Sequence, residues 1–160
     1  CASRSGEVRG ALWSEIDQEK SVWIIPAERM KAGKEHRVPL SDQMQTILDN
    51  ARVLSGETGF LFAKKTKSGV VSENNALNLL KRFDPAITGH GARASFKGWA
   101  RSQRRYERDA IEFALAHGLP PLDAAYFREE LLEERRVLMQ DWADFVTGDS
   151  GVPTLRDAVI

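Results

Sequence analysis

The sequence has few of the features that would hold a chain together covalently or place it in a membrane. Its 160 residues include a single cysteine, Cys1, so an internal disulfide and a cysteine-based zinc site are both excluded. No apolar run is long enough to span a bilayer, and no secretory signal is present. With 29% charged and 42% hydrophobic residues, the chain is expected to be one globular domain in a reducing cytoplasm.

Excess positive charge is also missing, because 23 basic residues balance 23 acidic ones. Proteins that bind nucleic acid usually carry a surplus of lysine and arginine. The charges are nevertheless segregated: residues 90–108 hold six basic side chains against one acidic, and residues 109–149 hold ten acidic side chains against three arginines. This distribution either attracts phosphate locally or gives two solvated helix faces of opposite sign.

The hydrophobic pattern predicts a mainly helical fold with a small antiparallel sheet near the start. Residues 21–25 and 37–40 are predicted strands, Ala32-Gly33 offers the turn between them, and Pro39 favours an edge strand. Helices are predicted near residues 7–12, after the capping residues Ser41 and Ser72, at 90–103 and 107–117, around Tyr126, and at 129–146. No cap precedes the first helix, so the chain is expected to begin inside an element, and residues 148–160 to form a polar tail.

Apolar residues at turn spacing predict which faces of these helices are buried. They form one stripe after Ser41, a second after Ser72 and a third in the last helix. The stripes are Met44, Ile47, Leu48, Ala51 and Leu54; Ala76, Leu79, Leu80 and Phe83; and Leu131, Leu138, Trp142 and Phe145. Phe60-Leu61-Phe62 is predicted to be a short buried piece, and Trp13, Trp99 and Trp142 to be core anchors.

Two pairs of polar residues have the three-residue spacing that places side chains on one face of a helix. His90 and Arg93 form one pair, with Gly91 between them allowing backbone or substrate to come close. Arg4 and Glu7 form the other. It is interpreted either as an ion pair within the helix or as a phosphate-binding guanidinium steadied by a carboxylate. Each pair taken alone is equally typical of an ordinary solvated helix.

Tyrosine is scarce, and its two occurrences have different surroundings. Tyr126 follows His117 by nine residues, whereas Tyr106 lies among the arginines of Arg104-Arg105-Tyr106-Glu107-Arg108. That positive surrounding is expected to lower the pKa of the Tyr106 phenol, which makes Tyr106 a rival nucleophile that ranks below Tyr126. In structural terms, His117 is equally a helix C-cap and Tyr126 a core aromatic.

A phosphodiester transfer through a protein nucleophile sets three chemical requirements. A side chain must attack phosphorus, cations must hold the non-bridging oxygens, and an acid must protonate the departing alkoxide. Arginine suits the second role because its planar fork stays charged and meets two oxygens at once. Lys31, at the tip of the Lys31-Ala32-Gly33-Lys34 turn, is either a solvated surface lysine or a mobile acid.

Six motifs in this order resemble the catalytic domain of tyrosine recombinases, and the phage and prophage integrases in particular. They are Arg4-Ser5-Gly6-Glu7, the Lys31 turn ending in Arg37-Val38-Pro39-Leu40, His90-Gly91-Ala92-Arg93, Leu115-Ala116-His117, Ala125-Tyr126, and the helix from Glu134 to Trp142. The resemblance implies the fold of these DNA breaking-rejoining enzymes over residues 1–147, without its usual lead-in segment, followed by a C-terminal tail at 148–160.

The resemblance also implies a role for each residue. Tyr126 would attack the scissile phosphate and form a 3′-phosphotyrosyl link, while Arg4 and Arg93 clamp the non-bridging oxygens. Lys31, or else Lys34, would protonate the 5′-oxygen. The remaining implied contacts are His90 as base or phosphate donor, His117 as a further donor, Glu7 as support for Arg4, and Lys34, Arg37, Lys97 and Arg101 on DNA. The implied partners are double-stranded attachment-site DNA and a synaptic tetramer of the protein itself, and no metal or cofactor is required.

Three other functions remain open on the sequence. A non-catalytic remnant would keep the fold and bind DNA or protein, as the missing lead-in and the neutral charge favour. A topoisomerase of the related type IB would share the chemistry but relax supercoils; the Glu134–Trp142 helix argues against it. A metal-dependent nuclease is disfavoured because no carboxylates cluster at ligand spacing near the histidines.

Overall fold

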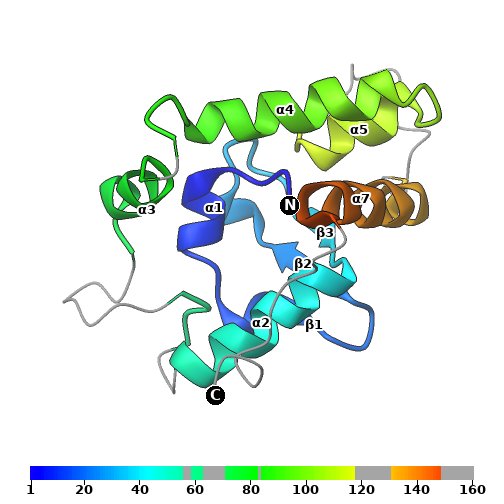
Figure 1. Ribbon diagram of the computed structural model, residues 1–160. Helices are drawn as coiled ribbons and strands as arrows, with labels where there is room; N and C mark the ends of the chain where they lie inside the picture. The colour runs from blue at the N-terminus through cyan, green and yellow to red at the C-terminus, as the bar shows by residue number, and fades with distance from the viewer. Residues whose placement is uncertain (56–58, 63–70, 83, 118–130, 149–160) are drawn as a thin grey trace.

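The computed structural model describes residues 1–55, 59–62, 71–82, 84–117 and 131–148. A three-stranded sheet and helix α2 (Asp42–Ser55) lie on one side of this region, and helices α4 (Gly89–Ser102) and α5 (Arg108–Ala114) lie on the other (Figure 1). Helix α7 (Leu132–Thr147) contacts α2, α4, α5 and strand β3. The predicted architecture, mainly helical with a small antiparallel sheet, is confirmed.

The sheet consists of β1 (Ile16–Asp17), β2 (Val22–Ile25) and β3 (His36–Pro39) in that order, with both pairings antiparallel. The two predicted strands are present, and β1 was not predicted because two residues carry no pattern. Pro39 lies in an edge strand, as expected, where its missing N–H leaves no gap in a ladder.

The predicted turn before β3 follows a short 3₁₀ helix, η2 (Ala27–Arg29). Gly33 has a φ of 62°, in the left-handed region that glycine adopts freely, and its N–H donates to the Met30 carbonyl at 3.0 Å. Met30 is buried, so it anchors the base of the turn, while Lys31 and Lys34 are exposed.

Helix α1 (Ser5–Arg9) is shorter than predicted, since Ala11 and Leu12 lie beyond its C-cap. The expectation that it lacks a cap was wrong: Arg4 is the N-cap residue, and its backbone N–H donates to the Glu7 carboxylate at 2.6 Å. Ala11 instead joins the 59–62 segment, because its carbonyl accepts from the backbone N–H of Leu61 at 2.9 Å.

Two of the predicted apolar stripes are buried only in part. In α2 the Ser41 hydroxyl accepts from Met44 N–H, so the predicted cap is confirmed, and Leu48 and Ala51 are buried, but Leu54 is 75% exposed. In α3 (Glu73–Leu80) both Leu79 and Leu80 are exposed. Phe83 lies outside the described residues, and of the Phe60-Leu61-Phe62 piece only Leu61 is fully buried.

The described residues form two apolar cores. The first joins the sheet and α2 through Trp23, Ile25, Val38 and Leu48; the second joins α4, α5 and α7 through Phe96, Ile111, Leu115, Leu138 and Met139. Trp13 packs against the first core, and Trp99 and Trp142 pack against the second, as predicted.

Phe145 departs from the predicted buried face of the last helix. It is 61% exposed, and its ring stacks on those of Trp99 and Trp142 at centroid distances of 5.5 and 5.6 Å. The helix predicted around Tyr126 and the tail after Gly148 lie outside the described residues. None of the described helices is both long enough and apolar enough to cross a membrane.

Candidate active site

Arg4 and Glu7 form a tight pair at the start of α1. Arg4 Nη1 lies 2.8 Å from Glu7 Oε1, and the other carboxylate oxygen accepts the Arg4 backbone N–H. The Glu7 side chain is 4% exposed and that of Arg4 is 33% exposed. The carboxylate is therefore committed to the protein, whereas part of the guanidinium faces solvent and can meet a ligand. Both predicted interpretations of the pair, ion pair and supported guanidinium, fit this geometry.

Arg93 comes from α4, whose first turn is fixed by a cap. The Thr88 hydroxyl accepts from Gly91 N–H at 2.9 Å, and a Cβ at position 91 would lie 3.0 Å from that hydroxyl, closer than a side chain normally comes. Gly91 therefore leaves room for the side chain of the capping residue Thr88. The helix then presents Arg93 to the N-terminal segment: Nη1 donates to the Ala2 carbonyl and Nη2 to the Leu115 carbonyl, the latter at 2.7 Å.

Arg93 also reaches the end of α5. Its Nη2 lies 3.3 Å from Nε2 of His117. Burial lowers the pKa of Arg93, and the positive charge of Arg4 lowers it further while Glu7 opposes the shift. Two predicted arginines and one predicted histidine, from three separate parts of the sequence, therefore lie in one electrostatically coupled group.

His117 is held by a residue that sequence reasoning did not find, Glu112. His117 Nδ1 lies 2.7 Å from Glu112 Oε2, and the His117 backbone N–H donates to the Glu112 carbonyl at 3.0 Å. This return is possible because Ala116 adopts a φ of 51°, which ends the helix and turns the chain back. Lys97 Nζ lies 2.5 Å from the other Glu112 oxygen, so the predicted DNA contact Lys97 is paired with this carboxylate.

The Glu112 carboxylate is charged at neutral pH. Burial raises its pKa, but the hydrogen bonds from Lys97 and His117 outweigh burial and leave the pKa below its ordinary value. The sequence provided little indication that Glu112 contacts His117, because side chains five residues apart do not lie on the same face of a helix. Only the break at Ala116 brings the two side chains together.

A second unpredicted neighbour is His36 of β3, which is 6% exposed. Burial and then the positive charge of Arg135 lower its pKa from 6.5 to about 4; Arg4 and Arg93 act in the same direction, and Glu7 acts against them. Arg135 itself is fully buried and donates to the Phe113 carbonyl at 3.4 Å. His36 is therefore neutral at physiological pH, and the guanidinium groups of Arg135, Arg4 and Arg93 act on it.

The other predicted site residues lie at the surface. His90 is exposed in the first turn of α4, one turn before Arg93, and within the described part of the chain no hydrogen bond or ion pair joins the two. Lys31 and Lys34 are exposed on the turn before β3, Arg37 pairs with Glu35 at 3.0 Å, and Arg101 is exposed near the end of α4. Their roles on DNA stay predictions.

Of the two tyrosines, the structure describes the position of Tyr106 alone. Tyr126 lies outside the described residues, so its position relative to the arginines stays a prediction. Tyr106 lies beyond the end of α4 opposite His90, and its hydroxyl donates to Asp141 at 2.5 Å. The expectation of a lowered pKa there was wrong: burial raises the pKa of Tyr106, and the hydrogen bond to Asp141 adds to the rise despite the opposing effect of Arg105.

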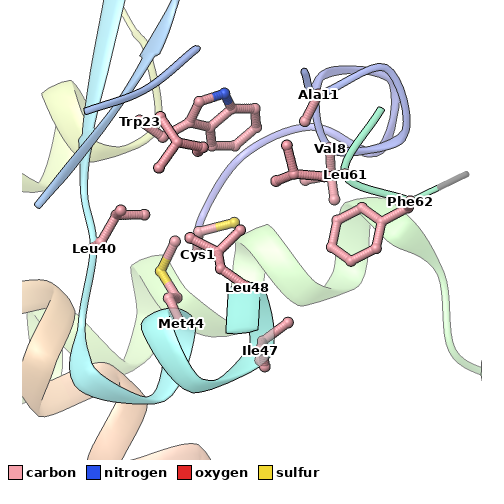
Figure 2. Close-up of a pocket in the computed structure, with 11 residues that line it drawn as sticks. Cys1, Val8, Ala11, Trp23, Leu40, Met44, Ile47, Leu48, Leu61 and Phe62 are labelled. Atoms are coloured by element: carbon pink, nitrogen blue, oxygen red, sulfur yellow. The ribbon is translucent and has the colours of Figure 1, made fainter. Parts of the chain in front are cut away.

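Among the described residues, we find no metal site and no polar cavity that would serve as an alternative centre. No group of three or more histidine, cysteine, aspartate or glutamate side chains that could hold a metal occurs among the residues with described positions. The cavity drawn in Figure 2 has a volume of about 180 Å³ and is lined by apolar side chains such as Trp23, Met44 and Phe62. Such a lining does not suit a phosphate.

Comparison with known proteins identifies a family and several relatives. The Phage integrase family matches residues 1–118 of the chain. Prophage integrase IntA of Escherichia coli K12 is 40% identical over 154 residues, which cover 93% of this chain and 37% of IntA. The integrase of Enterobacteria phage P4 is 36% identical, covering 89% of this chain and 37% of the relative. Prophage integrase IntZ of Escherichia coli K12 is 35% identical, covering 91% and 37%. No solved structure matches significantly.

The chain belongs to the Phage integrase family, the family of tyrosine recombinases that the sequence motifs resembled. It spans a little over a third of the length of the curated relatives that it matches.

Proposed function

We propose that this chain is the catalytic part of a site-specific DNA recombinase, with Tyr126 as the nucleophile that cuts and rejoins DNA. The observation that carries the proposal is the convergence of Arg4, Arg93 and His117. Each can donate a hydrogen bond to a phosphate oxygen, and each is held by an acceptor within the protein. Two guanidinium groups in a partly buried site oppose the charge that accumulates on a phosphorane more strongly than they would in water.

The chemistry assigned to this site balances without a cofactor. The Tyr126 oxygen forms a bond to phosphorus as the bond to the 5′-oxygen breaks, and the leaving oxygen takes a proton from Lys31 or Lys34. The phenolic proton passes to His90, or to solvent when His90 instead donates to phosphate. The 3′-phosphotyrosyl link keeps the energy of the broken bond, so a 5′-hydroxyl from another strand can reverse the step without ATP or metal.

The turn before β3 supports the role of the lysine. Its base is held by buried Met30, while Lys31 and Lys34 stand exposed at the tip and are free to enter a DNA groove. Arg37 and Arg101 are also exposed, and we propose that they contact the DNA backbone. Lys97 retains a proposed DNA contact as well, although its present partner is Glu112.

The proposed partners follow from this reaction. The substrate is double-stranded DNA with an attachment site in a bacterial or phage-infected cytoplasm, and strand exchange requires four protomers in a synaptic complex. We assign catalysis to residues 1–147, of which 1–118 match the family, and treat residues 148–160 as a C-terminal tail.

The test is covalent trapping on a nicked duplex that carries the attachment site, read on a denaturing gel. The proposal expects a protein–DNA adduct that Tyr126→Phe abolishes and that Arg93→Ala reduces by about 10² or more, as for loss of one transition-state donor. Salt-dependent binding without any adduct would instead support the non-catalytic remnant. Relaxation of supercoils without strand exchange would support a topoisomerase.

A further inference from the structure

The four residues Arg93, Lys97, Glu112 and His117 form a continuous chain of polar contacts between α4 and α5, which lie side by side in Figure 1. Hydrogen-bonding rules fix the protonation of this chain. A carboxylate only accepts, so the Glu112 contact requires a proton on His117 Nδ1. A guanidinium only donates, so the Arg93 contact requires that His117 Nε2 carry no proton. Both contacts can be hydrogen bonds together only in the tautomer that carries its hydrogen on Nδ1.

A phosphate or sulfate oxygen changes this balance because it, too, only accepts. A hydrogen bond from His117 Nε2 to such an oxygen requires a proton on Nε2. While Glu112 holds the proton on Nδ1, the second proton must come from solvent, and the ring becomes an imidazolium. Arg93 Nη2 loses its contact with the ring in the same step, and that hydrogen can turn toward the anion while the bonds to the Ala2 and Leu115 carbonyls remain.

We infer that Glu112 is a positioning residue that makes anion binding at the Arg4–Arg93–His117 site take up one proton. The inference rests on the proposed function, since it assumes that a tetrahedral anion occupies that site. The balance is one proton from solvent added to His117 Nε2, with no bond broken in the anion.

The surroundings of His117 determine how strongly Glu112 controls this step. The facing charges are Arg93 and Lys97 from α4, Glu112 from α5, and Arg4 from α1, whose charge is coupled to that of Arg93. Three of them are positive and oppose a further positive charge. Glu112 is the negative group in direct contact with the ring, with a side chain that is 15% exposed. Glu7, the other carboxylate of this site, is already paired with Arg4, so without the Glu112 charge the imidazolium would be left in contact with the cation Arg93.

The test uses histidine side-chain NMR, which reports the proton on each ring nitrogen. The chain has only three histidines, and His117→Asn identifies the signals of interest. Sodium sulfate is the probe, compared with sodium chloride at equal ionic strength, and the arginine side-chain signals of Arg4 and Arg93 report binding independently. Without sulfate, neutral His117 should carry its proton on Nδ1. With sulfate at the same pH, both ring nitrogens should be protonated.

The decisive variant is Glu112→Gln, whose amide oxygen still accepts from Nδ1 but carries no charge. We expect it to bind sulfate about tenfold more weakly at neutral pH and to show no protonation of His117 on binding. Glu107→Gln removes the same charge from the N-cap of α5, away from His117, and should behave as the unsubstituted chain does.

The outcomes separate this inference from the function on which it rests. If sulfate shifts the Arg4 and Arg93 signals while His117 stays neutral, the role of Glu112 is overturned and the anion site stands. If sulfate leaves all these signals unchanged, the anion site itself fails, and the inference fails with it. An Nε2 proton on neutral His117 before any addition would refute the inference in the unsubstituted chain, whether or not Glu112→Gln folds.

Discussion

Acid should destabilise the fold through one buried residue, His36. Its pKa falls from 6.5 to about 4 because the ring is buried and because Arg135, Arg4 and Arg93 lie near it, with Glu7 giving partial compensation. A group whose folded-state pKa is lowered binds its proton more readily when unfolded. The neutral ring therefore contributes full stability above pH 6.5, and this contribution is lost as the pH falls from 6.5 toward 4.

The size of the effect follows from the two pKa values. Between pH 8 and pH 5, the unfolded ring becomes protonated while the folded ring stays mostly neutral. The resulting loss in the free energy of unfolding is about 2 kcal/mol. Other titrating groups contribute as well, so the His36 share must be isolated by comparing two proteins.

The His36 contribution to the free energy of unfolding is isolated by urea unfolding at pH 8 and pH 5. His36→Gln is measured beside the unsubstituted chain. The substitution has its own packing cost at both pH values, but the variant should lose about 2 kcal/mol less between them. His90→Gln, which changes an exposed histidine, is the matched control and should keep the acid sensitivity of the unsubstituted chain. Equal losses for His36→Gln and the unsubstituted chain would refute the assignment of a buried neutral ring.

Three further predictions concern stability. Leu138→Ala, at a position with no exposed area, should cost about 2–5 kcal/mol in urea unfolding, whereas Val137→Ala, at a 58% exposed neighbour, should change stability by under about 0.5 kcal/mol. Glu15→Ala leaves Arg29 and the Trp23 indole without their shared acceptor and should cost about 3 kcal/mol; a cost near zero would show that this pair is not held in solution. Tyr106→Phe removes one hydrogen bond to Asp141 and should cost about 1 kcal/mol by thermal unfolding, without reducing DNA trapping.

Local signals in the sequence were sufficient for several elements. Ser41 as a helix cap, Gly33 in the turn and Pro39 in an edge strand each depend on the residue's own backbone chemistry, and all three are observed. The burial of apolar helix faces depends on what packs against them. The hydrophobic pattern therefore predicted burial for Leu54 and Leu79, and in the described part of the chain both side chains are exposed.

The candidate site shows the same division. Arg4, Arg93 and His117 were predicted as a set because their motifs occur in order, and the structure brings them together. Glu112 was not predicted, because its contact with His117 requires a left-handed backbone at Ala116. Glycine or asparagine would have indicated that conformation, but alanine does not. His36 lies one residue before the predicted strand 37–40, and its charged neighbours Arg135 and Arg93 come from helices distant in the sequence.

The central claim is that Tyr126 takes up the scissile phosphate while Arg4 and Arg93 neutralise its charge. Mass spectrometry of the trapped and digested protein–DNA adduct tests it most directly, because the chain has only two tyrosines. The account predicts a nucleotide remnant on the peptide that contains Tyr126, retained in Tyr106→Phe and absent in Tyr126→Phe. A remnant on Tyr106, or an adduct that persists in Tyr126→Phe, would contradict it.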